Sequence, residues 1–219
     1  MTEAEWLAAT DPQPIKKFLA GKVSDRKFRL LHVAYCRTVW ELLTDERSRK
    51  AVLLLEDYAD HLEREQLRRE AEVLAMAAVP EVGDASDHSG DPARAVAIAA
   101  SWFRQNVSSV PYWEFGIGST ASMVMHNDRQ ATGKLEADWL RHLFGNPFRP
   151  VALDPRWLTE TVVALAIGIY VERAFDRLPI LADALEDAGC ESRDVLDHCR
   201  GPGPHVRGCW VVDLLLGKA

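Results

Sequence analysis

The chain has 219 residues, of which 47% are hydrophobic and 27% charged, a composition that excludes global disorder. Its net charge of −7 argues against general nucleic-acid binding, which needs surplus Lys and Arg to neutralise phosphates. No apolar run approaches the roughly 20 residues of a membrane span, and the acidic start with Glu3 and Glu5 differs from a signal peptide. We therefore expect a soluble protein of the cytoplasm that does not span a membrane.

The first third of the chain has the signals of consecutive helices. Thr2 followed by Glu5 has the form of a capping box, in which each side chain binds a backbone amide at the start of a helix. Ser24, and then Thr44 or Asp45, precede runs whose apolar residues recur at spacings of three and four. These signals predict amphipathic helices that begin directly after the capping residues.

Residues 79–91 interrupt the helical pattern with Pro, Gly, Ser and Asp. Such a composition is typical of a flexible surface loop. The sequence therefore predicts an N-terminal helical segment over residues 1–78 and a C-terminal helical region over residues 92–219. The two regions form either separate domains or one continuous domain.

The second half also predicts helices, separated by Gly and Pro. No stretch alternates apolar and polar residues for long enough to require a strand. The expected helices cover residues 92–103, a segment ending at Met125, and residues 135–144, 157–175, 179–189, 193–200 and 206–216. The whole pattern predicts an all-α fold, a compact multi-helix array with a helix–turn–helix unit at its C-terminal end.

Five stretches of the sequence carry a resemblance to a known family. The chain opens with TEAEWLAATDP and SDRKFRLLHVAYCR, continues after Leu143 with FGNPFRPV, and ends with ILADALEDAGC and HCRGPGPHVRGCWVVDLLLGK. These motifs resemble a large uncharacterised paralogous family of planctomycete bacteria, and the resemblance leaves out the middle, from about Leu67 to Glu136. The family has no assigned activity, so the resemblance implies architecture. Since related endings recur on otherwise different proteins, it also implies a reusable module.

Cysteine and histidine residues gather near the C-terminus. Residues Cys190, His198, His205 and Cys209 have the ligand types of a Cys2His2 zinc site, with Cys199 as a substitute ligand. If the last helix begins at or before His205, then His205 and Cys209 lie on one face of it. The Gly-Pro-Gly-Pro turn can bring His198 back toward His205. The spacing differs from the usual zinc motifs, in which ligands stand two to four residues apart at each end.

A second interpretation of the same residues is core packing. Cysteine is among the most buried residue types and packs as a small hydrophobe, so Cys190 and Cys209 can fill space between helices. Under this interpretation Trp210, Val211 and Leu214 belong to the core. His142, four residues after Asp138, forms an ordinary helix pair with it.

A thiol nucleophile is the third interpretation. It needs a cysteine activated by a histidine that is in turn oriented by an acid. The candidates are Cys209 or Cys199 as nucleophile, His205 or His198 as base, and Asp197 or Asp213 as the orienting group. No known signature of a thiol enzyme surrounds these cysteines.

The signatures of common enzyme classes are missing from the sequence. It contains no GxGxxG, P-loop, GxSxG or HExxH motif. The first functional hypothesis is therefore a non-enzymatic helical module that binds another protein, without a catalytic residue or a cofactor. The alternative is a zinc-binding or thiol-dependent enzyme centred on the C-terminal cysteines and histidines.

Overall fold

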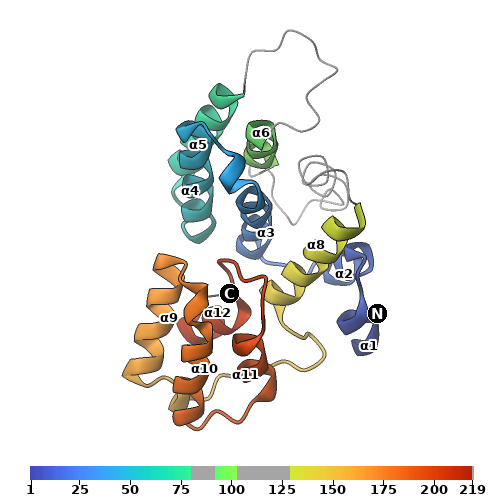
Figure 1. The fold of residues 1–219 in the computed structure, drawn as a ribbon, viewed down its shortest axis with the longest axis vertical. Helices are drawn as coiled ribbons and strands as arrows, with labels where there is room; N and C mark the ends of the chain where they lie inside the picture. Colours follow the sequence, from blue (N-terminus) through green and yellow to red (C-terminus); the bar gives the residue numbers. More distant parts are fainter. Residues whose placement is uncertain (80–91, 103–128, 219) are drawn as a thin grey trace. The chain divides into compact units, whose positions relative to one another are not determined.

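The computed structural model describes residues 1–79, 92–102 and 129–218. Within these ranges every regular element is an α-helix or a 3₁₀ turn and none is a strand, which confirms the predicted all-α fold (Figure 1). In the same ranges no helix combines the length and apolar character needed to cross a bilayer. Apart from Val79, the predicted loop at 79–91 lies outside the described residues, as does the helix predicted to end at Met125.

Contacts between residues divide the chain into two compact units. Unit 1 comprises Met1–Ala8 and Asp138–Ala219, and unit 2 comprises Ala9–Ala137. Helix α8 (Arg129–Phe144) contributes residues to both. Met1–Ala8, which the sequence pattern groups with the rest of residues 1–78, thus belongs to the same unit as the C-terminal helices.

Unit 2 is a set of helices around one apolar core. Its elements are α2 (Pro12–Leu19), α3 (Asp25–Thr38), the 3₁₀ turn η1 (Trp40–Leu42), α4 (Glu46–Asp60), α5 (Glu65–Ala78) and α6 (Pro92–Trp102). Helix α4 packs against α3 and α5, and α6 contacts all three. On α4 the buried residues Val52, Leu55 and Ala59 recur every three or four positions, so one stripe of the helix faces the core.

Polar contacts at both ends of these helices follow the local sequence. The hydroxyl of Ser24 accepts a hydrogen bond from the amide of Lys27 at 3.3 Å, and the carboxylate of Asp45 accepts one from the amide of Arg47 at 2.7 Å. Both residues are N-caps, as predicted. An ion pair between Arg26 and Asp60, with an N···O distance of 2.7 Å, joins α3 to the end of α4.

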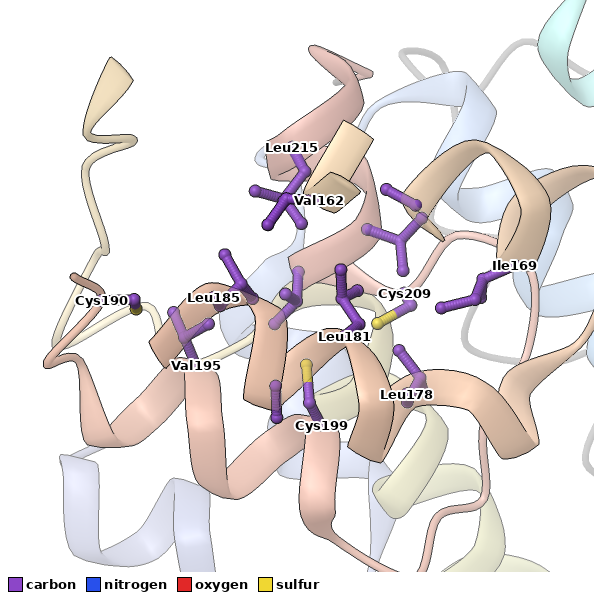
Figure 2. Packing of buried hydrophobic residues seen from close by; sticks show 14 of the residues in the cluster. Val162, Ile169, Leu178, Leu181, Leu185, Cys190, Val195, Cys199, Cys209 and Leu215 are labelled. Carbon is purple, nitrogen blue, oxygen red and sulfur yellow. The ribbon is translucent and has the colours of Figure 1, made fainter. Parts of the chain in front are cut away.

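Unit 1 packs its C-terminal helices around a second apolar core (Figure 2). Its elements are α1 (Glu3–Ala8), the end of α8, the 3₁₀ turns η4 (Pro155–Trp157) and η5 (Phe175–Arg177), α9 (Glu160–Glu172), α10 (Leu178–Asp187), α11 (Arg193–Arg200) and α12 (Trp210–Leu216). Helices α9, α10, α11 and α12 contact one another in sequence order and α12 returns to α9. Leu178, Leu181 and Leu185 of α10 are fully buried at the centre.

Helix α1 joins unit 1 through contacts with residues far along the chain. The predicted capping box is present, since the amide of Thr2 donates to the Glu5 carboxylate at 2.7 Å and the Glu5 amide donates to the Thr2 hydroxyl at 3.3 Å. The guanidinium of Arg141 donates to the backbone carbonyl of Trp6 at 2.9 Å, and the Trp6 side chain is buried. These contacts stabilise the C-terminal end of α8, which carries His142.

The last helix begins later than the sequence predicts. The expected start at residue 206 is wrong, because α12 begins at Trp210 and Cys209 is its N-cap residue. Gly208 has a φ of 94°, a left-handed conformation that ends any helix before it. As a result His205 and Cys209 do not share the face of one helix, and residues 201–209 form an irregular segment between α11 and α12.

Candidate metal site

Three histidines and one cysteine of unit 1 come together from different elements. His142 lies in the last turn of α8, and His198 lies in the last turn of α11. His205 belongs to the irregular segment after α11, and Cys209 caps α12. The ring centroid of His142 lies 5.0 Å from that of His198 and also 5.0 Å from that of His205. The arrangement therefore depends on the tertiary packing of α8 against the C-terminal segment.

His142 contacts the backbone of a residue 64 positions later. Its Nε2 atom lies 3.0 Å from the carbonyl oxygen of Val206 and 3.1 Å from the amide nitrogen of the same residue. The side chain is 4% exposed. The backbone of Val206 thus offers Nε2 both an acceptor and a donor.

His205 is oriented by a backbone carbonyl and by His142. Its Nε2 lies 3.0 Å from the carbonyl oxygen of Gly201, and its Nδ1 lies 3.3 Å from Nδ1 of His142. A carbonyl oxygen only accepts, so Nε2 of His205 carries a proton and donates it. In the neutral ring Nδ1 of His205 is therefore the acceptor.

One arrangement of protons satisfies the contact between the two neutral rings. Because Nδ1 of His205 accepts, Nδ1 of His142 carries the proton between the two rings. The Nε2 atom of His142 then has a lone pair and accepts from the amide of Val206. The pair forms a continuous chain of hydrogen bonds from the Val206 amide to the Gly201 carbonyl. In the opposite tautomer of His142, Nε2 carries the proton and donates to the carbonyl of Val206 instead.

His198 and Cys209 form the second half of the cluster. Nε2 of His198 lies 3.1 Å from Sγ of Cys209, and the His198 ring packs against the Trp210 ring with centroids 5.3 Å apart. Cys209 is 1% exposed. The sulfur is thus held next to an imidazole inside the protein.

One potential ligand atom from each of His142, His198 and Cys209 lies within 4.8 Å of the other two. In a tetrahedral zinc site, metal–nitrogen bonds of about 2.0–2.1 Å and metal–sulfur bonds of about 2.3 Å separate the ligand atoms by about 3.3–3.6 Å. Nε2 of His198 and Sγ of Cys209 are closer than this, at 3.1 Å, and all three atoms lie within 4.8 Å, so the side chains have to adjust their spacing around an ion.

The structure brings together part of the predicted ligand set. His198 and Cys209 lie in contact, and His205 reaches the cluster through His142. Cys190 lies elsewhere, after α10, where its amide donates to the carbonyl of Leu185 at 2.9 Å, and Figure 2 shows it apart from Cys199 and Cys209. Cys199 is buried in the same apolar core.

His142 is a member of the group that the sequence pattern did not predict as a ligand. Its position in the sequence indicates burial, because it follows Trp139 by three residues and precedes Leu143. Both of these are buried core residues of α8. A histidine in an apolar helical stripe is a buried polar group that needs partners. The sequence does not say that these partners come from Val206 and His205.

The cysteine thiols outside the cluster are not activated. Burial raises the pKa of Cys199 well above its ordinary value, and the thiols of Cys209 and Cys190 act in the same direction. Burial also raises the pKa of Cys190, although the Ser192 amide opposes the shift. A nucleophilic thiol needs a lowered pKa and access for a substrate, so neither residue fits that role in this structure.

Comparison with known proteins adds no assignment to this geometry. No protein-family model, curated protein or solved structure matches the chain.

Proposed function

We propose that this chain binds one transition-metal ion, with zinc as the best fit, through His142, His198 and Cys209. The observation that carries the proposal is the convergence of one potential ligand atom from each of three separate elements, all within 4.8 Å. Two of the three side chains are buried and that of His198 is half-buried.

The donor atoms indicate the class of metal. Imidazole nitrogen and thiolate sulfur suit zinc and its neighbours, whereas magnesium and calcium prefer carboxylate and carbonyl oxygen. The group contains two nitrogens and one sulfur and no carboxylate. Binding needs Cys209 as the thiolate, so loading the site releases the thiol proton to solvent.

The surroundings favour a structural role for the ion. Its ligands come from the end of α8, the end of α11 and the start of α12, so an ion joins three elements of unit 1. A structural ion stabilises a module without giving it a reaction. The proposal is thus compatible with the protein-interaction module predicted from sequence, and binding of another protein stays a prediction.

The test is metal analysis of protein purified without a histidine tag. We expect wild-type protein, reconstituted with zinc and desalted, to retain close to one ion per chain. The variants His142→Ala and Cys209→Ala lose it, because each removes a ligand. Cys36→Ala is the matched control, since Cys36 is a buried cysteine of unit 2 and is no member of the group.

Two results would contradict the proposal. One is wild-type protein that retains no zinc after reconstitution. The other is equal zinc content in wild type and Cys209→Ala when both have the same circular dichroism spectrum. If Cys209→Ala does not fold, cobalt-loaded wild-type protein decides, because a cobalt–thiolate bond adds a charge-transfer absorption band that a sulfur-free site does not have.

A further inference from the structure

A set of three ligands leaves the coordination of a structural ion incomplete. Structural zinc sites have four protein ligands, whereas sites with three protein ligands keep the fourth position for water or substrate. His205 is the nearest additional donor, since its ring centroid lies 5.0 Å from that of His142 and 5.6 Å from that of His198.

The distance between His142 and His205 suits two ligands of one ion. Their Nδ1 atoms lie 3.3 Å apart. Two nitrogens bound to the same tetrahedral zinc at about 2.0–2.1 Å are separated by about 3.3–3.4 Å. The pair thus already has the spacing of one edge of a zinc tetrahedron.

The backbone orients His205 as it orients known metal ligands. Metal-binding histidines nearly always donate the other ring N–H to a carboxylate, a backbone carbonyl or water, which leaves the ligating nitrogen unprotonated. His205 donates from Nε2 to the carbonyl of Gly201, so its Nδ1 lone pair is directed at His142. Gly203 makes room for this ring, because a Cβ at that position would lie 3.2 Å from Cδ2 of His205.

His142 can present its Nδ1 to an ion without moving its ring. In the arrangement that joins the two rings, Nδ1 of His142 carries the proton and Nε2 accepts from the Val206 amide. If the proton moves to Nε2, that atom donates instead to the Val206 carbonyl, 3.0 Å away. The number of protons on the ring is unchanged, and Nδ1 gains the lone pair that binds the metal.

We propose, on the basis of the proposed metal binding, that Nδ1 of His205 is the fourth ligand and that the site is a closed Cys1His3 centre. His142 binds the ion through Nδ1 after its proton has moved to Nε2. His205 lies outside the group of three whose atoms are within 4.8 Å, so its ring rotates toward His198 and Cys209 when the ion enters. With the three imidazole rings neutral, the proton released on binding is that of the Cys209 thiol.

X-ray absorption of the zinc-loaded protein tests the ligand count. We expect wild type to show three imidazoles and one sulfur. His205→Ala should show two imidazoles, one sulfur and one water oxygen. Its zinc affinity, measured by competition with a chromophoric chelator, should fall more than about 100-fold, because changes to groups that only orient a ligand cost about 10–100-fold. His61→Ala is the control, since His61 follows α4 in unit 2 and its ring contacts Asp57 of that helix.

The outcomes separate the two proposals. Wild-type protein that binds no zinc overturns the proposed function itself. Zinc bound by one sulfur and two imidazoles in wild type overturns the fourth ligand and leaves the three-residue site standing. The same conclusion follows if His205→Ala keeps the wild-type number of imidazoles, whatever its affinity. Should that variant fail to fold, the wild-type count alone decides.

Discussion

His32 illustrates how burial controls a single titratable residue. It is fully enclosed on α3, where its Nδ1 lies 2.8 Å from the carbonyl oxygen of Phe28. Burial lowers the pKa of His32 to about 3, because desolvation disfavours the imidazolium. The hydrogen bond to Phe28 opposes the shift, and the positive charges of Lys16 and Arg29 reinforce it. The ring is therefore neutral in the folded protein at all ordinary pH values.

A pH dependence of stability follows from this pKa. An unfolded histidine titrates near 6.5, so below that pH the unfolded chain binds a proton that the folded chain does not. The contribution of His32 is present above pH 6.5 and is lost as the pH falls toward 3. Between pH 7 and pH 5 we expect a loss on the order of 2 kcal/mol in the free energy of unfolding.

Urea unfolding of wild type and His32→Gln at pH 7, 6 and 5 measures this contribution. The variant starts from a lower stability, but its stability should fall less steeply with decreasing pH. His61→Gln serves as the comparison, because His61 is partly exposed. Parallel pH profiles for wild type and His32→Gln would show that the buried ring does not titrate as described.

At the scale of elements, two glycines end helices in the same left-handed conformation. Gly145 follows α8 with a φ of 64°, and Gly217 follows α12 with a φ of 63°. Their surroundings differ. A Cβ atom at Gly145 would lie 3.0 Å from Cδ2 of Trp210, whereas a Cβ atom at Gly217 would have no other atom within 4 Å. Trp210 packs against His198, so Gly145 helps to position the candidate site.

The two alanine variants separate backbone strain from packing. Gly217→Ala should lower the free energy of unfolding by about 1 kcal/mol, because an alanine is strained in the left-handed conformation. Gly145→Ala carries the same strain and also pushes against the Trp210 ring, so it should cost roughly 1–3 kcal/mol more. Chemical denaturation of both variants gives the difference. Equal losses in the two proteins would mean that Trp210 moves aside at no cost.

At the scale of the whole molecule, the ligands of the candidate site belong to unit 1 alone. The three residues of the group and His205 fall within Asp138–Ala219. A ligand that binds only the folded state stabilises it by about 2.7 kcal/mol when present at 100 times its dissociation constant. Different parts of a protein open locally with different free energies. We therefore expect zinc to reduce local opening mainly in the helices that carry the ligands.

Hydrogen exchange with and without zinc tests this localisation. Amides of α11 and α12 should exchange more slowly in the presence of zinc, because the proposed ion would join these helices to the end of α8. Amides of α3 and α4 in unit 2 should change little. Slowing spread evenly over both units would contradict a site confined to unit 1, and Cys209→Ala should remove the effect.

Local features of the structure were accessible from the sequence because their partners lie a few residues apart. The capping box of Thr2 and Glu5 and the N-cap at Ser24 involve residues three positions apart, and the structure confirms both. The start of the last helix was predicted wrongly. Apolar residues continue the helical pattern back to Val206, and the pattern does not reveal that Gly208 adopts a left-handed conformation.

The sequence by itself determined the all-α fold, since the spacing of apolar residues, the helix caps and the glycines that end helices all depend on residues close together in the chain. It also supplied His198, His205 and Cys209 as candidate ligands. Only the tertiary structure decided that His142 joins them and that Cys190 does not. The reason is physical, because His142 meets Val206 across 64 residues and such a contact depends on how helices pack rather than on any local preference.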